Sequence, residues 1–194
     1  MVIRQDPISK GLAIMGLLIP VFISTFELTL YALFPSFLLI AGIVGQRYVL
    51  KKIDEDPTID AGEFSDIMFW SFAALTVILV SSLVIPYFAY PSSIETETLD
   101  IMSLRLFVVL MAIAEEQFFR GFLTNFFLVK LPPAFAVLAS GSIFAIYHFG
   151  VYGTSFDLIG YVWIAGTILS YIAVKTQRLS PCMLAHIVNN LLAV

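Results

Sequence analysis

Apolar runs long enough to cross a lipid bilayer fill most of this 194-residue chain. Residues 11–50 contain one acid, Glu27, and one base, Arg47, and they are roughly twice as long as a single helical crossing requires. Backbone groups in hydrocarbon must satisfy their own hydrogen bonds, which favours helices. The composition agrees, because 60% of the residues are apolar, 12% are charged and the mean hydropathy is +0.97. The sequence therefore predicts an all-α, polytopic transmembrane helical bundle.

Seven spans fit this pattern best, with six and eight left open. Two of them share residues 11–50, with a turn expected near residues 27–35. The other five are expected at residues 67–90, 101–129, 133–149, 158–174 and 181–194. The longest polar loop, residues 51–66, is too short to bury a core of its own. Residues 1–194 are therefore predicted to form a single domain.

Basic residues outside the predicted spans occur only in alternate connections. The connections at residues 87–100 and 150–157 contain none. The basic residues are Arg4 and Lys10, then Arg47, Lys51 and Lys52, then Lys130, and then Lys175 and Arg178. The positive-inside rule predicts a cytoplasmic N-terminus, and the small size of the chain favours a prokaryotic cell membrane. A net charge of −4 without a basic cluster argues against a nucleic acid partner, which leaves the lipid bilayer as the expected surroundings.

Ionisable side chains inside apolar spans are costly in lipid, so each one is a candidate functional residue. Glu27 and Arg105 lie near predicted span ends, where their side chains can reach the interface. Glu116 and Arg120 are four residues apart, which places them on one helix face as a neutralised ion pair. That pairing leaves the adjacent Glu115 without a partner, because neighbouring helical residues point about 100° apart.

The chain contains two histidines, and both lie inside apolar spans. His186 precedes Asn190 by one helical turn, so their side chains share a face. Two such donors can stabilise an oxyanion, or they can serve as hydrogen-bonding groups between helices. His148 and Glu115 each lie about sixteen residues from the connection at residues 130–133, so an antiparallel helix pair places them at similar depth.

The position of His186 fits this depth less well, because it lies only about eight residues beyond Arg178. All three groups can meet if the hairpin at Lys130 extends past the membrane boundary by roughly 10 Å. They can also meet if one helix is broken near Gly121 or Gly141. The sequence leaves these two solutions open.

Three motifs in this order resemble those of a known family. The segments Glu115-Glu116-Gln-Phe-Phe-Arg120, Phe144-Ala-Ile-Tyr-His148 and His186-Ile-Val-Asn-Asn190 are similar to the EExxxR, FxxxH and HxxxN/B motifs of the CPBP family. This family, also called Abi, includes type II CaaX prenyl endopeptidases and bacteriocin-processing or immunity proteins. The resemblance covers residues 100–194, the motif-bearing core, and does not extend to the first three spans.

The resemblance implies an intramembrane endopeptidase acting on a membrane-associated peptide or protein. It implies that Glu115 is a general base that polarises a water together with His148. His186 and Asn190 would then hold the developing oxyanion. The ion pair of Glu116 and Arg120 would support the first of these helices, and Phe144 would supply aromatic packing next to His148.

A metal requirement and two other function classes stay open at this point. Glu115, His148 and His186 could form a two-histidine, one-carboxylate zinc set, but the histidines are 38 residues apart and no HExxH motif is present. Direct catalysis by glutamate and histidine is therefore preferred, and no cofactor is assigned. The alternatives are a non-catalytic membrane scaffold or bacteriocin-immunity-type binding protein of the same family, and a transporter or proton path. A rhomboid-like dyad of Ser140 and His186 is disfavoured, since the glycine two residues before the serine is missing.

Overall fold

The computed structural model describes residues 1–52, 64–84 and 100–194, and these residues form an all-helical bundle. The fold class predicted from the sequence is confirmed, and each of the seven predicted spans contains a helix. The elements are α1 (Pro7–Phe22), α2 (Phe26–Lys52), α3 (Phe64–Val84), α4 (Ile101–Glu116), the π-helical segment η2 (Gln117–Thr124), α5 (Asn125–Leu128), α6 (Pro133–Tyr147), α7 (Phe149–Tyr152), α8 (Phe156–Thr176) and α9 (Ser180–Leu192). Residues 85–90 of the third predicted span lie outside the described residues.

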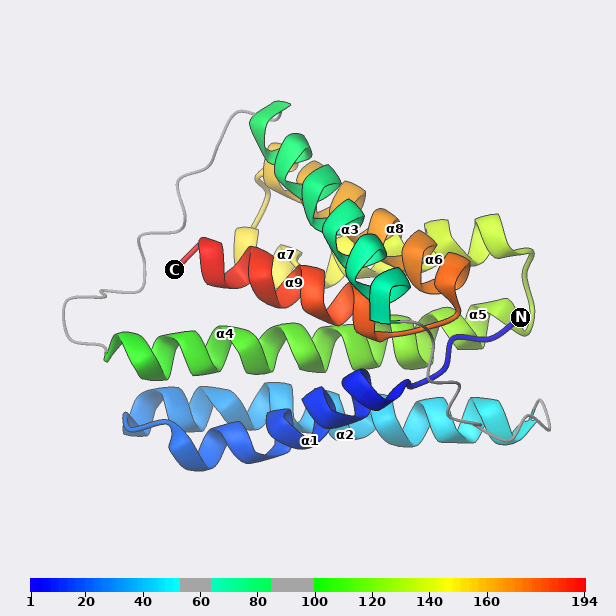
Figure 1. Ribbon diagram of the computed structural model, residues 1–194. Coiled ribbons are helices and arrows are strands. Elements are labelled where there is room, and N and C mark those ends of the chain that lie inside the picture. Colours follow the sequence, from blue (N-terminus) through cyan, green and yellow to red (C-terminus); the bar gives the residue numbers. More distant parts are fainter. Residues whose placement is uncertain (53–63, 85–99) are drawn as a thin grey trace.

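A continuous rod of α4, η2 and α5 runs through the middle of the molecule (Figure 1). In this view α1 and α2 lie on one side of the rod, and α3, α6, α8 and α9 lie on the other. Helix α2 packs along α4 and η2, helix α9 packs against α3 and α4, and helix α6 packs along α8. The rod is therefore the element that both halves of the bundle share.

Among the described residues, four helical segments are long and apolar enough to cross a membrane. They are Phe26–Lys52, Phe64–Ser81, Pro133–Tyr152 and Phe156–Thr176, whereas Pro7–Phe22 is a shorter apolar helix. Large apolar side chains point outward from them, as lipid-facing side chains do; Phe26, Phe37 and Phe72, for example, are more than 70% exposed. The bundle is an integral membrane fold.

The turn expected near residues 27–35 is wrong. The first connection lies at residues 23–25, and Pro35 is buried inside α2. Proline removes one backbone donor, but transmembrane helices tolerate it where nearby hydroxyls and neighbouring helices satisfy the backbone. Here the Ser36 hydroxyl donates to the Ala32 carbonyl at 2.8 Å, one turn back across the proline.

From Glu115 onward, the buried face of the rod carries polar side chains. The buried polar residues of this stretch, each at most 3% exposed, are Glu115, Glu116, Gln117, Arg120, Thr124 and Asn125. Helix α2 approaches this stretch closely at Gly42, where a Cβ would lie 2.8 Å from the backbone of Gln117 and Phe118. Only glycine fits this contact, so Gly42 sets the distance between α2 and the π-helical segment.

The N-terminal segment is tied into the same polar interior. Ile3 and the Asn125 side chain exchange two hydrogen bonds, both of 2.8 Å. The Gln5 amide donates to Gln117 Oε1 at 2.7 Å, which connects the segment to η2. Asp6 accepts from the Ser9 amide through Oδ1 and from the Ser180 amide through Oδ2, at 3.0 and 3.1 Å, so one buried carboxylate caps both α1 and α9.

Two of the basic residues predicted to share one side of the membrane, Arg4 and Arg178, lie next to each other. The Arg4 amide donates to the Gln177 carbonyl at 2.9 Å, which places Arg4 beside Arg178. Cys182 is fully buried, and its thiol donates to the Leu169 carbonyl at 3.0 Å.

Candidate active site

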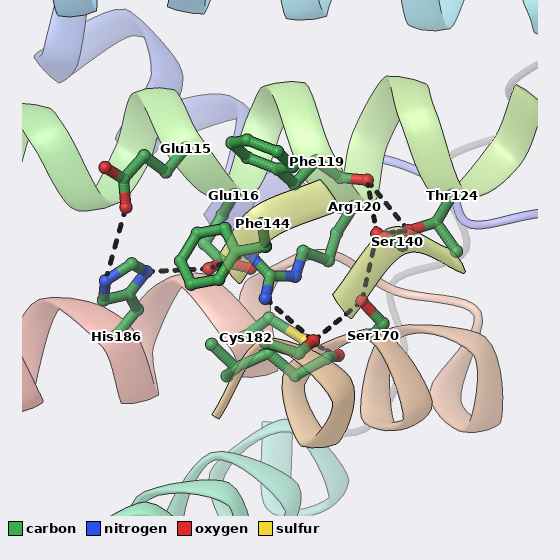
Figure 2. Close-up of polar contacts among 12 residues, drawn as sticks. Glu115, Glu116, Phe119, Arg120, Thr124, Ser140, Phe144, Ser170, Cys182 and His186 are labelled. Atoms are coloured by element: carbon green, nitrogen blue, oxygen red, sulfur yellow. Dashed lines mark hydrogen bonds and ion pairs between the residues drawn. The ribbon is translucent and has the colours of Figure 1, made fainter. Parts of the chain in front are cut away.

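The motif residues lie where the end of α4 meets α9 and α6. Glu115 and Glu116 are the last residues of α4, Arg120 lies in η2, and His186 lies near the middle of α9. Figure 2 shows the Glu115 carboxylate, the His186 ring and the Glu116 carboxylate in sequence, with Arg120 beyond them. Tertiary packing therefore joins two motifs that are about seventy residues apart in the sequence.

Glu116 is the hub of this arrangement. Its Oε1 accepts from Arg120 Nη1 at 2.9 Å and from His186 Nδ1 at 2.7 Å. The side chains of Glu116 and Arg120 are both 0% exposed, so the ion pair predicted from their spacing exists and is fully buried. A buried charge requires such compensation, because an unpaired one is several kcal/mol less stable.

The Arg120 guanidinium also holds α6 and α8 in place. Its Nη2 donates to the Gly166 carbonyl of α8 at 2.9 Å, and its central carbon lies 4.3 Å from the Phe144 ring centroid. Gly166 leaves room for that ring, because a Cβ there would lie 2.7 Å from Phe144 Cδ1. The arginine therefore ties three helices together at the base of the site.

Glu115 faces the second nitrogen of the same histidine. Its Oε2 lies 3.7 Å from His186 Nε2, too far for a direct hydrogen bond. A water about 2.8 Å from both atoms fits this separation. Because the Nδ1 hydrogen of His186 is donated to Glu116, Nε2 is the ring nitrogen that faces Glu115. Glu115 is only 3% exposed, so the position is largely shielded from outside.

His148 lies at the end of α6 in an aromatic surrounding. Its Nδ1 donates to the Phe144 carbonyl at 2.8 Å, which leaves Nε2 as the free nitrogen. The ring lies 4.4 Å from the Phe144 ring and stacks on Tyr152 at 5.9 Å. His148 is close enough to Glu115 and His186 to interact with both electrostatically.

Asn190 lies one turn after His186 and also reaches toward α4. Its amide donates to the Val108 carbonyl at 3.4 Å, two turns before Glu115 in the sequence of that helix. The shared face predicted for His186 and Asn190 is thus directed at α4. Within the part of the chain that the structure describes, the side-chain hydrogen bond of Asn190 goes to this carbonyl and not to a glutamate.

One of the two helix breaks suggested from the sequence was placed near Gly121. The structure has an irregular stretch of helix there, not a break. The helix continues, but over Gln117–Thr124 it adopts the wider π-helical winding, which shifts the side chains that follow. The Thr124 hydroxyl donates to the Phe119 carbonyl five residues earlier at 2.8 Å, and also contacts Ser140 at 2.8 Å. Gly141, the other suggested site, lies inside regular α6.

Two features of the site escaped the sequence reasoning. The first is a buried hydroxyl cluster of Thr124, Ser140 and Ser170, which lies on the far side of Arg120 from His186 (Figure 2). Its only sequence signal is hydroxyl residues inside apolar spans. The second is Tyr147, whose hydroxyl approaches the Glu115 carboxylate closely enough to interact with it. In the sequence, the available sign of this contact was the position of Tyr147 directly before the motif histidine, His148.

The zinc set considered from the sequence, Glu115, His148 and His186, stays a prediction. Among the described residues, no group of three or more His, Cys, Asp or Glu side chains is arranged to hold a metal ion. His186 Nδ1 is bonded to Glu116 and His148 Nδ1 is bonded to a carbonyl, which leaves the Nε2 atoms of both rings as the nitrogens that could bind a ligand.

Comparison with known proteins gives one match. The family model for type II CAAX prenyl endopeptidase Rce1-like proteins matches residues 97–192, about half of the chain. Neither a curated protein nor a solved structure gave a match. The matched residues contain all three motifs and every side chain of the site described above. The chain therefore belongs to the CPBP family, as a member with similarity to the type II CAAX prenyl endopeptidases of the Rce1-like group.

Proposed function

We propose that this protein is an intramembrane endopeptidase that hydrolyses peptide bonds with a water activated by Glu115. The observation that carries the proposal is the 3.7 Å separation of Glu115 Oε2 and His186 Nε2 in a buried polar site. An ion pair needs one carboxylate, and Glu116 already supplies it to Arg120. A second buried carboxylate beside two histidines has no structural task of the same kind, which favours a chemical one.

Glu115 serves as the general base in the proposed reaction. It takes a proton from the bridging water, whose oxygen attacks the carbonyl carbon of the scissile bond. The free Nε2 of His148 accepts the second hydrogen of this water and orients it. Glu115 then delivers its proton to the amine nitrogen as the carbon–nitrogen bond breaks, so the proton balance closes on one residue.

Donors on α9 stabilise the oxyanion that forms during the attack. His186 contributes its Nε2 edge, and Glu116 fixes the orientation of the ring through Nδ1. The Asn190 amide has a second hydrogen beyond the one it shares with Val108. The Tyr147 hydroxyl interacts with Glu115 and helps to position that carboxylate. Glu116 and Arg120 act through these groups by fixing their positions.

The proposed substrate is a membrane-associated hydrophobic peptide or lipoprotein segment. The site lies within a bundle whose outer surface is apolar, so a substrate that is already held in the bilayer reaches it most readily. We also propose that the basic end, where Arg4 lies beside Arg178, faces the cytoplasm. Labelling of single cysteines placed at Gln5 and Thr154 with a membrane-impermeant maleimide tests this orientation, since only one of them should react in intact cells.

The decisive experiment is cleavage of fluorogenic peptides, plain and lipid-modified, by the purified protein in detergent. Glu115→Gln should lower kcat/KM by about 10²–10⁴-fold, as removal of a general base does. Glu27→Gln, the same change at an exposed glutamate of α2, serves as the matched control and should keep full activity. Wild-type activity in Glu115→Gln would refute the base assignment. An inactive wild-type protein on every peptide would favour a binding role for the family fold.

A chelator arm separates the metal-free reaction from the zinc reaction. Activity that persists in chelator and disappears in Glu115→Gln agrees with the proposal. Loss of activity in chelator, followed by recovery with added zinc, would contradict it.

A further inference from the structure

A polar cavity lies away from the candidate active site, where α3 meets the connection between α8 and α9. Its volume is about 180 Å³. Three charged side chains line it, Asp66 from the first turn of α3 and Lys175 and Arg178 from the end of α8 and the following turn. The Trp70 indole lines it as well. None of these residues belongs to the three motifs, so the cavity requires a separate explanation.

The charges in the cavity are available to a ligand. Within the described ranges 1–52, 64–84 and 100–194, no ion pair involves Asp66, Lys175 or Arg178. Two cations and one anion together carry a net charge of +1. A ligand that presents one anionic group and one cationic group matches this set, with its anion between Lys175 and Arg178 and its cation at Asp66.

The cavity lies at the basic end of the bundle, next to an apolar surface. The Gln177 carbonyl, between Lys175 and Arg178 in the sequence, accepts a hydrogen bond from the Arg4 amide, so the N-terminal segment borders this region. Trp70 is half-buried, and Phe69 packs edge-to-face on it at 5.3 Å. Phe69 itself is 63% exposed on the outer face of α3. Tryptophan with basic residues at a helix end is typical of the membrane–water interface.

We propose that this cavity binds the headgroup of an aminophospholipid of the phosphatidylethanolamine type. The phosphate lies between Lys175 and Arg178, the ammonium lies at Asp66, and the acyl chains extend along the apolar face that begins at Phe69. Basic pockets between helices at the cytoplasmic surface bind phospholipid headgroups by this electrostatic means. A soluble phosphate would use the same two cations but would leave Asp66 opposite an anion and gain nothing from the apolar face.

Trp70 offers a direct signal, because the chain contains two tryptophans. In a Trp163→Phe background, Trp70 is the remaining fluorophore. The full-length protein is reconstituted in phosphatidylcholine vesicles that contain increasing fractions of phosphatidylethanolamine with brominated chains, which quench tryptophan on contact. Half-maximal quenching should occur at a lower mole fraction of brominated phosphatidylethanolamine than of brominated phosphatidylcholine. Equal quenching by the two lipids would overturn the proposal.

Charge variants assign the selectivity to the cavity. Lys175→Gln with Arg178→Gln should raise the half-quenching fraction of the ethanolamine lipid about tenfold or more. The matched control, Lys51→Gln with Lys52→Gln, removes two charges from the end of α2 that do not line the cavity, and it should change nothing. Lys175→Gln alone, at an exposed position, gives a smaller shift of the same sign and guards against misfolding of the double variant. The site would be refuted if Lys51→Gln with Lys52→Gln lost the preference for phosphatidylethanolamine while Lys175→Gln with Arg178→Gln kept it.

Two further arms identify the chemistry of the ligand. Asp66→Asn should abolish the preference for phosphatidylethanolamine over phosphatidylglycerol, since only the former carries an ammonium group. An unchanged preference would overturn the assignment of Asp66. Inorganic phosphate in millimolar amounts should leave the quenching intact. Release of the lipid by phosphate would show that the cavity is a site for soluble anions and would overturn the lipid assignment.

Discussion

The two adjacent glutamates of the first motif should respond differently to the same substitution. Glu116→Gln keeps the size of the side chain and removes the charge that compensates Arg120. The guanidinium, 0% exposed, would retain uncharged partners, among them the Gly166 carbonyl and the Phe119 and Phe144 rings, but would lose its counter-charge. Removing one partner of a buried ion pair costs about 3–5 kcal/mol, because the other charge stays buried without compensation. Glu115→Gln removes no such partner from Arg120 and should affect unfolding much less.

Thermal unfolding in detergent measures this difference. At roughly 2–4 °C per kcal/mol for a chain of this size, the melting temperature of Glu116→Gln should fall by roughly 6–20 °C. The double variant Glu116→Gln with Arg120→Met should recover part of this loss, since replacing both charges with uncharged side chains removes the unpaired cation. A single variant that melts within about 2 °C of wild type, or a double variant less stable than the single one, would refute the argument that burial of the pair controls stability.

Three other changes test the packing and the caps that position the site. Gly42→Ala places a methyl group against the backbone of η2 and should cost about 1–3 kcal/mol, measured by thermal unfolding, whereas Gly160→Ala, with open space around its Cβ, should be neutral within that assay. Asp6→Ala leaves two buried amides without an acceptor and should cost at least about 2 kcal/mol, while exposed Asp157→Asn should not. Hydrogen bonds from the Ser103 hydroxyl and amide hold the pKa of the exposed Asp100 carboxyl below its usual range, so its capping contribution is present above the usual pKa and is lost as pH falls through the lowered one. The difference in melting temperature between wild type and Asp100→Asn should therefore be present at neutral pH and shrink in acid; a difference that grows in acid would contradict this sign.

The sequence alone determined the features that depend on neighbours along one helix. Apolar runs identified the helical segments, since lipid leaves the backbone few alternatives. The four-residue spacing of Glu116 and Arg120 fixed their ion pair before any packing was known, because that spacing places two side chains on one face. The same reasoning misplaced the first turn, which was expected near residues 27–35, whereas Pro35 lies inside α2.

Tertiary structure alone decided which groups meet across helices. His148 seemed the natural partner of Glu115, since both lie equally far from one connection, yet His186 is the histidine whose ring faces the carboxylate. The rod also winds as a π-helix between Glu115 and the connection to α6, and helices approach closely at Gly42 and Gly166. The periodicity of side chains in a sequence shows which residues share a face of one helix. The distance between two axes is set by the side chains that pack between them, and those contacts join residues far apart in the sequence.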